Sequence, residues 1–86
     1  MSAAPASDLV VYSTSWCPFC RLLKADLDQL GVEYREVDVD HDRDAAALVT
    51  EINRGNRVVP TVVFPDGSSL TNPAATEVTE RLAALA

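Results

Sequence analysis

The reactive side chains of this 86-residue sequence are concentrated in one short stretch, where Cys17 and Cys20 stand with two residues between them. Cysteines at this spacing can close a disulfide, supply half of a metal site or cycle as a redox dithiol. The pair follows an apolar run, 9–12, and opens a segment with helical periodicity, so Cys17 is predicted to lie at a strand-to-helix junction. Unpaired backbone N–H groups and the helix dipole favour a thiolate there, which makes Cys17 the expected nucleophile.

Redox turnover is the preferred interpretation of the cysteine pair. The first residues have no basic start and no apolar core of an export signal, so we expect a cytoplasmic protein, and the reducing cytosol rarely keeps a structural disulfide. A structural zinc site requires four ligands, and two cysteines with a distant His41 are too few. An iron–sulfur cluster shared between two chains stays open as an alternative. We therefore predict no metal ligands and no tightly bound cofactor.

Composition excludes several classes of partner. The net charge is −6, from 13 acidic and 7 basic side chains, and no basic stripe is present, which argues against nucleic acid and anionic membranes as partners. No apolar run approaches the roughly 20 residues that a membrane span needs. The apolar fraction of 48% and charged fraction of 23% are typical of globular domains. We expect a disordered tail over 1–7, a single domain over 8–86 and a monomer.

The spacing of apolar residues predicts the elements that position the cysteines, in the order β-α-β-α-β-β-α. The strands are expected over 9–13, 32–39, 58–64 and 68–70, and the helices over 18–30, 43–54 and 73–86. The first strand shows no alternation of apolar and polar residues, which predicts a central strand covered on both faces. Asp42 and Asn72 are the expected N-caps of the second and third helices. A βαβ unit followed by a ββα unit packs as one four-stranded mixed sheet with helices on both faces. The predicted class is therefore α/β.

The first predicted helix separates the roles of the two cysteines. Its core-facing stripe recurs at steps of three and four and consists of Cys20, Leu23, Leu27 and Leu30. Cys17 precedes this stripe by three residues, in the first turn and at the edge of the same face. We therefore predict two neighbouring sulfurs of different exposure, with Cys17 as the outer nucleophile and Cys20 as the inner, resolving thiol.

The element order, together with Cys17-Pro18-Phe19-Cys20 at a helix start and Val59-Pro60-Thr61 before the third strand, resembles the thioredoxin/glutaredoxin fold. Within the glutaredoxin-like branch, segments 53–62 and 66–73 look like those of the actinobacterial mycoredoxins. The resemblance implies a thiol-disulfide oxidoreductase that reduces mixed disulfides between proteins and mycothiol. Mycothiol would be its reducing co-substrate and mycothiolated proteins its partners. It also implies a cis peptide bond before Pro60, opposite Cys17, and a Val59 backbone that pairs with the substrate.

One segment departs from the glutaredoxins that use glutathione. Their glycine-rich and acidic signature before the last helix, which holds the glutamyl end of glutathione, is replaced here by Leu70-Thr71-Asn72-Pro73. The departure favours a thiol other than glutathione.

Several residues are predicted to line the substrate site beside the cysteines. They are Trp16, Phe19, Arg21, Arg57, Val59, Pro60, Thr71 and Asn72. Each has an ordinary structural interpretation as well: the indole could be a packing residue, the guanidinium groups solvated surface charges, and Asn72 a plain helix cap. In their functional interpretation the cations stabilise a thiolate or a ligand carboxylate, and the polar pair Thr71 and Asn72 contacts the small thiol.

The sequence leaves the reaction route open. In a monothiol route Cys17 takes up the small thiol and a second small-thiol molecule releases it, whereas in a dithiol route Cys20 attacks Cys17 and leaves an internal disulfide. Two alternatives to the main function also stay open. One is a thioredoxin-like dithiol reductant recharged by a flavin reductase, and the other is a non-catalytic module that carries an iron–sulfur cluster or binds a partner.

Overall fold

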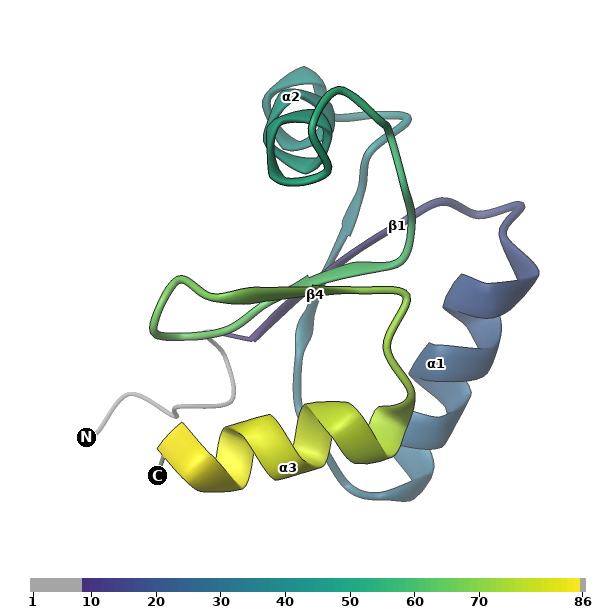
Figure 1. Ribbon diagram of the computed structural model, residues 1–86. Helices are drawn as coiled ribbons and strands as arrows, with labels where there is room; N and C mark the ends of the chain where they lie inside the picture. The colour runs from purple at the N-terminus through teal and green to yellow at the C-terminus, as the bar shows by residue number, and fades with distance from the viewer. Residues whose placement is uncertain (1–8, 86) are drawn as a thin grey trace.

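The computed structural model of the chain describes residues 9–85, and its elements follow the predicted order (Figure 1). The strands are β1 (Val10–Ser13), β2 (Arg35–Asp38), β3 (Thr61–Val63) and β4 (Ser69–Thr71). The helices are α1 (Pro18–Gln29), α2 (Arg43–Ile52) and α3 (Ala75–Leu85). The tail predicted over 1–7 lies outside the described residues.

The four strands form one mixed sheet in the order β2-β1-β3-β4. β1 is central as predicted, and it pairs in parallel with β2 and antiparallel with β3. Figure 1 shows α1 and α3 on one face of this sheet and α2 on the other, which confirms the predicted α/β layers. None of the helices described within 9–85 is long and apolar enough to cross a membrane.

Two apolar cores, one on each face of the sheet, explain why the β1 segment is apolar without alternation. Leu9 and Val11 pack with α1 and α3, whereas Tyr12, on the opposite face, packs against the α2 cluster around Val49. Successive side chains of a strand point to opposite faces, so a central strand covered on both sides requires apolar residues throughout.

The last turn of α1 differs from the prediction. Leu30 was expected on the core stripe, but it is the C-cap residue and its side chain is exposed. The helix ends at Gln29, and the chain reverses at Gly31, whose φ of +75° is readily adopted only by a residue without a side chain. The buried stripe is therefore shorter and consists of Cys20, Leu23 and Leu27.

The start of α3 also differs from the prediction. Asn72 does not cap the helix, because its φ of +51° places it in a left-handed turn and its backbone N–H donates to the Pro60 carbonyl at 2.7 Å. The helix begins instead at Ala75, and the Glu77 carboxylate accepts the backbone N–H of Ala74 at 2.8 Å. The Glu77 carboxylate therefore satisfies an N–H group at the helix start, which is the role that the sequence predicted for Asn72.

The division of α1 into a buried and an exposed face can be tested with two leucines of the same helix. Leu27 is fully buried in the core and Leu22 is exposed. We expect Leu27→Ala to lower the free energy of unfolding by about 2–5 kcal/mol through lost burial and a cavity. The matched variant Leu22→Ala should stay within about 0.5 kcal/mol of the parent. Urea unfolding measures both, and equal losses would contradict the assigned orientation of α1.

Candidate active site

Cys17 is held at the strand-to-helix junction by the backbone on both sides. It follows the β1 strand by a three-residue loop and is the N-cap of α1, where its Sγ accepts the backbone N–H of Cys20 at 3.3 Å. Its thiol also points to the Val59 carbonyl oxygen, 3.8 Å away. The peptide bond between Val59 and Pro60 is cis, which confirms what the resemblance implied. Both cysteines carry free thiols.

The predicted difference in exposure between the two cysteines is small. Cys17 is 3% exposed and Cys20 is 0% exposed, so the nucleophile is not the outer, open thiol that the sequence suggested. The segment around Val59 lies against Cys17, as the contact between its carbonyl and the sulfur shows. Packing from a segment 42 residues away covers this position, and helical spacing alone gives no sign of it.

Proton affinity distinguishes Cys20 from an ordinary cysteine. Burial, as the larger cause, and a hydrogen bond with the Cys17 side chain together raise the pKa of Cys20 to about 12. The Thr14 backbone and the charge of Lys24 act in the opposite direction but do not offset the desolvation. Cys20 therefore keeps its proton at neutral pH, and a protonated thiol is a poor nucleophile in disulfide exchange.

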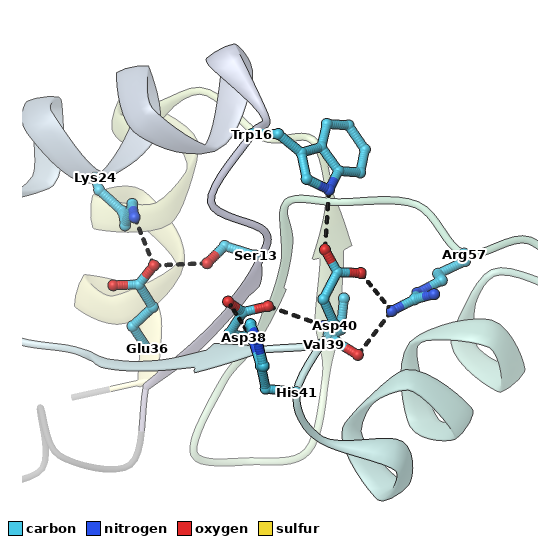
Figure 2. A network of polar contacts seen from close by, with 9 residues as sticks. All are labelled: Ser13, Trp16, Lys24, Glu36, Asp38, Val39, Asp40, His41 and Arg57. Atoms are coloured by element: carbon cyan, nitrogen blue, oxygen red, sulfur yellow. Dashed lines mark hydrogen bonds and ion pairs between the residues drawn. The ribbon is translucent and has the colours of Figure 1, made fainter.

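The two aromatic residues next to the cysteines are both exposed. Trp16 is 64% exposed, so the interpretation as a half-buried packing residue is wrong for this side chain. Its position is nevertheless fixed, because Nε1 donates to Asp40 Oδ2 at 2.9 Å (Figure 2). Phe19 is exposed as predicted and lines a shallow cavity of about 150 Å³ together with Asn72 and Pro73.

The two arginines predicted to line the site are engaged with the protein itself. Arg57 donates through Nη2 to the Val39 carbonyl and to Asp40 Oδ1, both at 2.7 Å (Figure 2). Arg21 donates to the Ser15 carbonyl at 3.3 Å. Among the described residues neither guanidinium has a cysteine sulfur as a hydrogen-bond partner. Their contact with a substrate stays a prediction.

The end of β4 meets the segment around Pro60. Asn72 is joined to the Pro60 carbonyl through its backbone N–H, and Thr71 donates through Oγ1 to Asn53 Oδ1 at 2.6 Å. The chain thus brings Asn72 to the same side of the site as Pro60 and Phe19, as the shared cavity shows. Binding of a small thiol by Thr71 and Asn72 stays a prediction.

Two carboxylates near the site, those of Asp40 and Glu36, accept hydrogen bonds that no local sequence pattern predicts. Asp40 joins Trp16 to Arg57, and Glu36 accepts from Ser13 at 2.7 Å and from Lys24 at 2.5 Å (Figure 2). The hydrogen bonds from Lys24 and then Ser13 lower the pKa of Glu36, so this carboxylate is ionised. No group of three or more His, Cys, Asp or Glu that could hold a metal ion is found within residues 9–85.

Comparison with known proteins identifies the family. The glutaredoxin family model matches residues 9–69. The chain is 49% identical over 80 residues to Mycoredoxin 1 of Corynebacterium glutamicum, an alignment that covers 93% of this chain and 99% of that protein. The chain belongs to the glutaredoxin family. This glutaredoxin is mycoredoxin-like and is a thiol-disulfide oxidoreductase.

Solved structures agree with this assignment. The glutaredoxin of Methanosarcina mazei is 27% identical with a TM-score of 0.72, covering 95% of this chain and 84% of its own. The buckwheat glutaredoxin–glutathione complex is 31% identical with a TM-score of 0.61, covering 90% of this chain and 69% of its own. The thioredoxin/glutaredoxin fold predicted from the sequence is therefore confirmed.

Selective alkylation tests the difference between the two thiols. With a pKa of about 12, only roughly one Cys20 in ten thousand is a thiolate near pH 8. We expect iodoacetamide to modify Cys17 and to leave Cys20 unmodified in the native protein, as measured by peptide mass spectrometry. In urea both cysteines should react, because burial no longer raises the pKa of Cys20. Equal labelling of both residues in the native protein would contradict this account.

Proposed function

We propose that this glutaredoxin reduces mixed disulfides between proteins and mycothiol in the cytoplasm, with Cys17 as the nucleophile and mycothiol as the reducing co-substrate. The observation that carries the proposal is that the two neighbouring sulfurs differ in their hydrogen bonds and in their affinity for a proton. Cys17 Sγ caps α1 and accepts the Cys20 N–H at 3.3 Å, while burial raises the pKa of Cys20. A hydrogen-bond donor at a helix N-terminus stabilises negative charge on sulfur.

The first step transfers mycothiol to the enzyme. The Cys17 thiolate attacks the mycothiol sulfur of the mixed disulfide, a Cys17–mycothiol disulfide forms, and the bond to the protein sulfur breaks. The protein leaves as a thiolate and takes a proton from solvent. In this proposal a backbone amide of an extended substrate segment pairs with the Val59 backbone, beside the Cys17 sulfur.

The second step restores the enzyme. The thiolate of a second mycothiol attacks the mycothiol sulfur held on Cys17, which releases the disulfide of mycothiol and regenerates the Cys17 thiolate. In total one mixed disulfide is reduced to the protein thiol and one free mycothiol is consumed, and the disulfide of mycothiol forms from that molecule and the mycothiol that the protein had carried. Neither metal ion nor tightly bound cofactor takes part in these steps.

The protonated state of Cys20 favours this monothiol route over the dithiol route. An attack by Cys20 on the Cys17–mycothiol disulfide requires the Cys20 thiolate, and burial, the largest cause of the raised pKa of Cys20 in the reduced protein, disfavours that thiolate. The mixed disulfide on Cys17 therefore persists long enough for a second mycothiol to reach it. The similarity to Mycoredoxin 1 over nearly the whole chain supports mycothiol as that thiol.

Substitution of each cysteine separates the two routes. We expect Cys17→Ser to abolish reduction of a mycothiol mixed disulfide, because a hydroxyl does not carry out disulfide exchange. Cys20→Ser should keep activity of the same order as the parent. The measurement is the rate of thiol release from a mycothiolated peptide in the presence of mycothiol. Equal loss in both variants would exclude the monothiol route.

Comparison of three reductant systems tests the choice of thiol. The parent protein is assayed with a mycothiol mixed disulfide, a glutathione mixed disulfide and a flavin-dependent thioredoxin reductase. We expect the highest turnover with mycothiol. A preference for the flavin reductase would assign the protein to the dithiol reductants instead, and a preference for glutathione would overturn mycothiol as co-substrate.

A further inference from the structure

A single carboxylate, that of Asp40, joins the two loops that flank the cysteine site. Its Oδ2 accepts from the Trp16 indole at 2.9 Å and its Oδ1 accepts from Arg57 Nη2 at 2.7 Å (Figure 2). Arg57 is also tied to the Val39 carbonyl at 2.7 Å, so its guanidinium is held against the start of the β2–α2 turn. The three segments meet at Asp40 although its partners are 24 and 17 residues away in the chain.

Both partners of Asp40 stand close in the chain to Cys17 or to the residue that contacts its sulfur. Trp16 is the residue before Cys17. Arg57 stands two residues before Val59, whose carbonyl lies 3.8 Å from Cys17 Sγ. Asp40 therefore holds the indole of the residue that precedes Cys17 and the arginine of the segment that leads to Val59.

The same contact decides how much positive charge is available to a ligand. Of the cations near the site, Lys24 is paired with Glu36 and Arg57 with Asp40. Arg21 donates to a neutral carbonyl, that of Ser15. Two of these three charges are thus compensated by carboxylates of the chain itself, and the overall charge of −6 adds a negative background.

Small thiols differ in the charge that they bring to such a site. Glutathione is a peptide with carboxylates at its ends, whereas mycothiol carries its cysteine on a sugar and has no carboxylate. A free guanidinium forms strong charge-assisted hydrogen bonds with a carboxylate. An arginine that is already paired within the protein forms weaker hydrogen bonds with the carboxylate of such a thiol.

We propose that Asp40 is a positioning residue that determines thiol specificity: by pairing with Arg57 and holding it against Val39, it disfavours carboxylate-bearing thiols and leaves the site suited to an uncharged one. This inference rests on the proposed function, because it concerns which thiol reaches Cys17. The size of the effect is limited by solvent, since the Arg57 and Asp40 side chains are 48% and 34% exposed. A partly exposed pair of this kind corresponds to roughly a twofold to fivefold change in relative rate.

The test measures single-turnover rates of the reduced protein with one cysteine peptide linked by a disulfide to glutathione or to mycothiol. We expect Asp40→Asn to raise the ratio of the glutathione rate to the mycothiol rate by about twofold to fivefold, because a carboxylate no longer compensates the charge of Arg57. The gain should shrink at high salt, as screening predicts. It should disappear in the double variant Asp40→Asn with Arg57→Gln. An unchanged ratio in Asp40→Asn, or a gain that persists in the double variant, would overturn the inference.

Asp28→Asn is the matched control, because Asp28 accepts a hydrogen bond from the Tyr34 hydroxyl away from the cysteines. Its ratio should equal that of the parent, and an equal change in both variants would overturn the specific role of Asp40. The single tryptophan of the chain provides a second readout. Loss of the bond to Asp40 should lower the fluorescence anisotropy of Trp16 in Asp40→Ala and leave it unchanged in Asp28→Asn.

The rates of the parent protein distinguish a failure of the proposed function from a failure of the inference about Asp40. Its own ratio of rates tests mycothiol as co-substrate, whereas the change of that ratio on substitution tests Asp40. A parent that prefers glutathione would overturn the first proposal, and Asp40→Asn would still report whether the Asp40–Arg57 pair shifts the preference.

Discussion

The bond from the Cys20 backbone N–H to the Cys17 sulfur, 3.3 Å long, is the interaction on which the site depends. A helix must satisfy its first N–H groups, and here the side chain that does so is that of Cys17, the proposed nucleophile. The cap requires α1 to begin at Pro18, directly after the loop that leaves the central strand β1. The length of this loop therefore determines where the sulfur of Cys17 lies relative to the end of β1.

The two cysteines differ in proton affinity far more than in exposure. Both side chains are nearly inaccessible, yet only Cys20 lies on the buried stripe of α1, where desolvation raises its pKa to about 12. Desolvation penalises the charged form of any thiol, and the Lys24 ammonium, itself paired with Glu36, compensates only part of that penalty. The burial that packs one face of α1 into the core thus also keeps the Cys20 thiol protonated, whereas Cys17 is the proposed nucleophile.

Local signals in the sequence were sufficient for the element order, the central position of β1 and the placement of the cysteines at a helix start. They were insufficient wherever a distant segment decided the outcome. Asn72 reads locally as a cap, but its backbone pairs with Pro60 and the helix starts three residues later. The cover over Cys17 comes from Val59, 42 residues away, and the partners of Asp40 are similarly remote. Helical periodicity and capping rules contain no information about such contacts.

Arg57 illustrates why residue type alone does not define a binding role. An arginine two residues before Val59 is well placed in the sequence to meet an anionic ligand, and its guanidinium would be a strong site for one if it were free. The carboxylate of Asp40 accepts from it at 2.7 Å, and the Val39 carbonyl fixes its direction. The charge of Arg57 is then already paired within the protein, and a ligand carboxylate must compete with Asp40 for it. Under the proposal that Asp40 sets thiol specificity, the choice of thiol follows from which cations the fold has already neutralised, as much as from which cations the sequence contains.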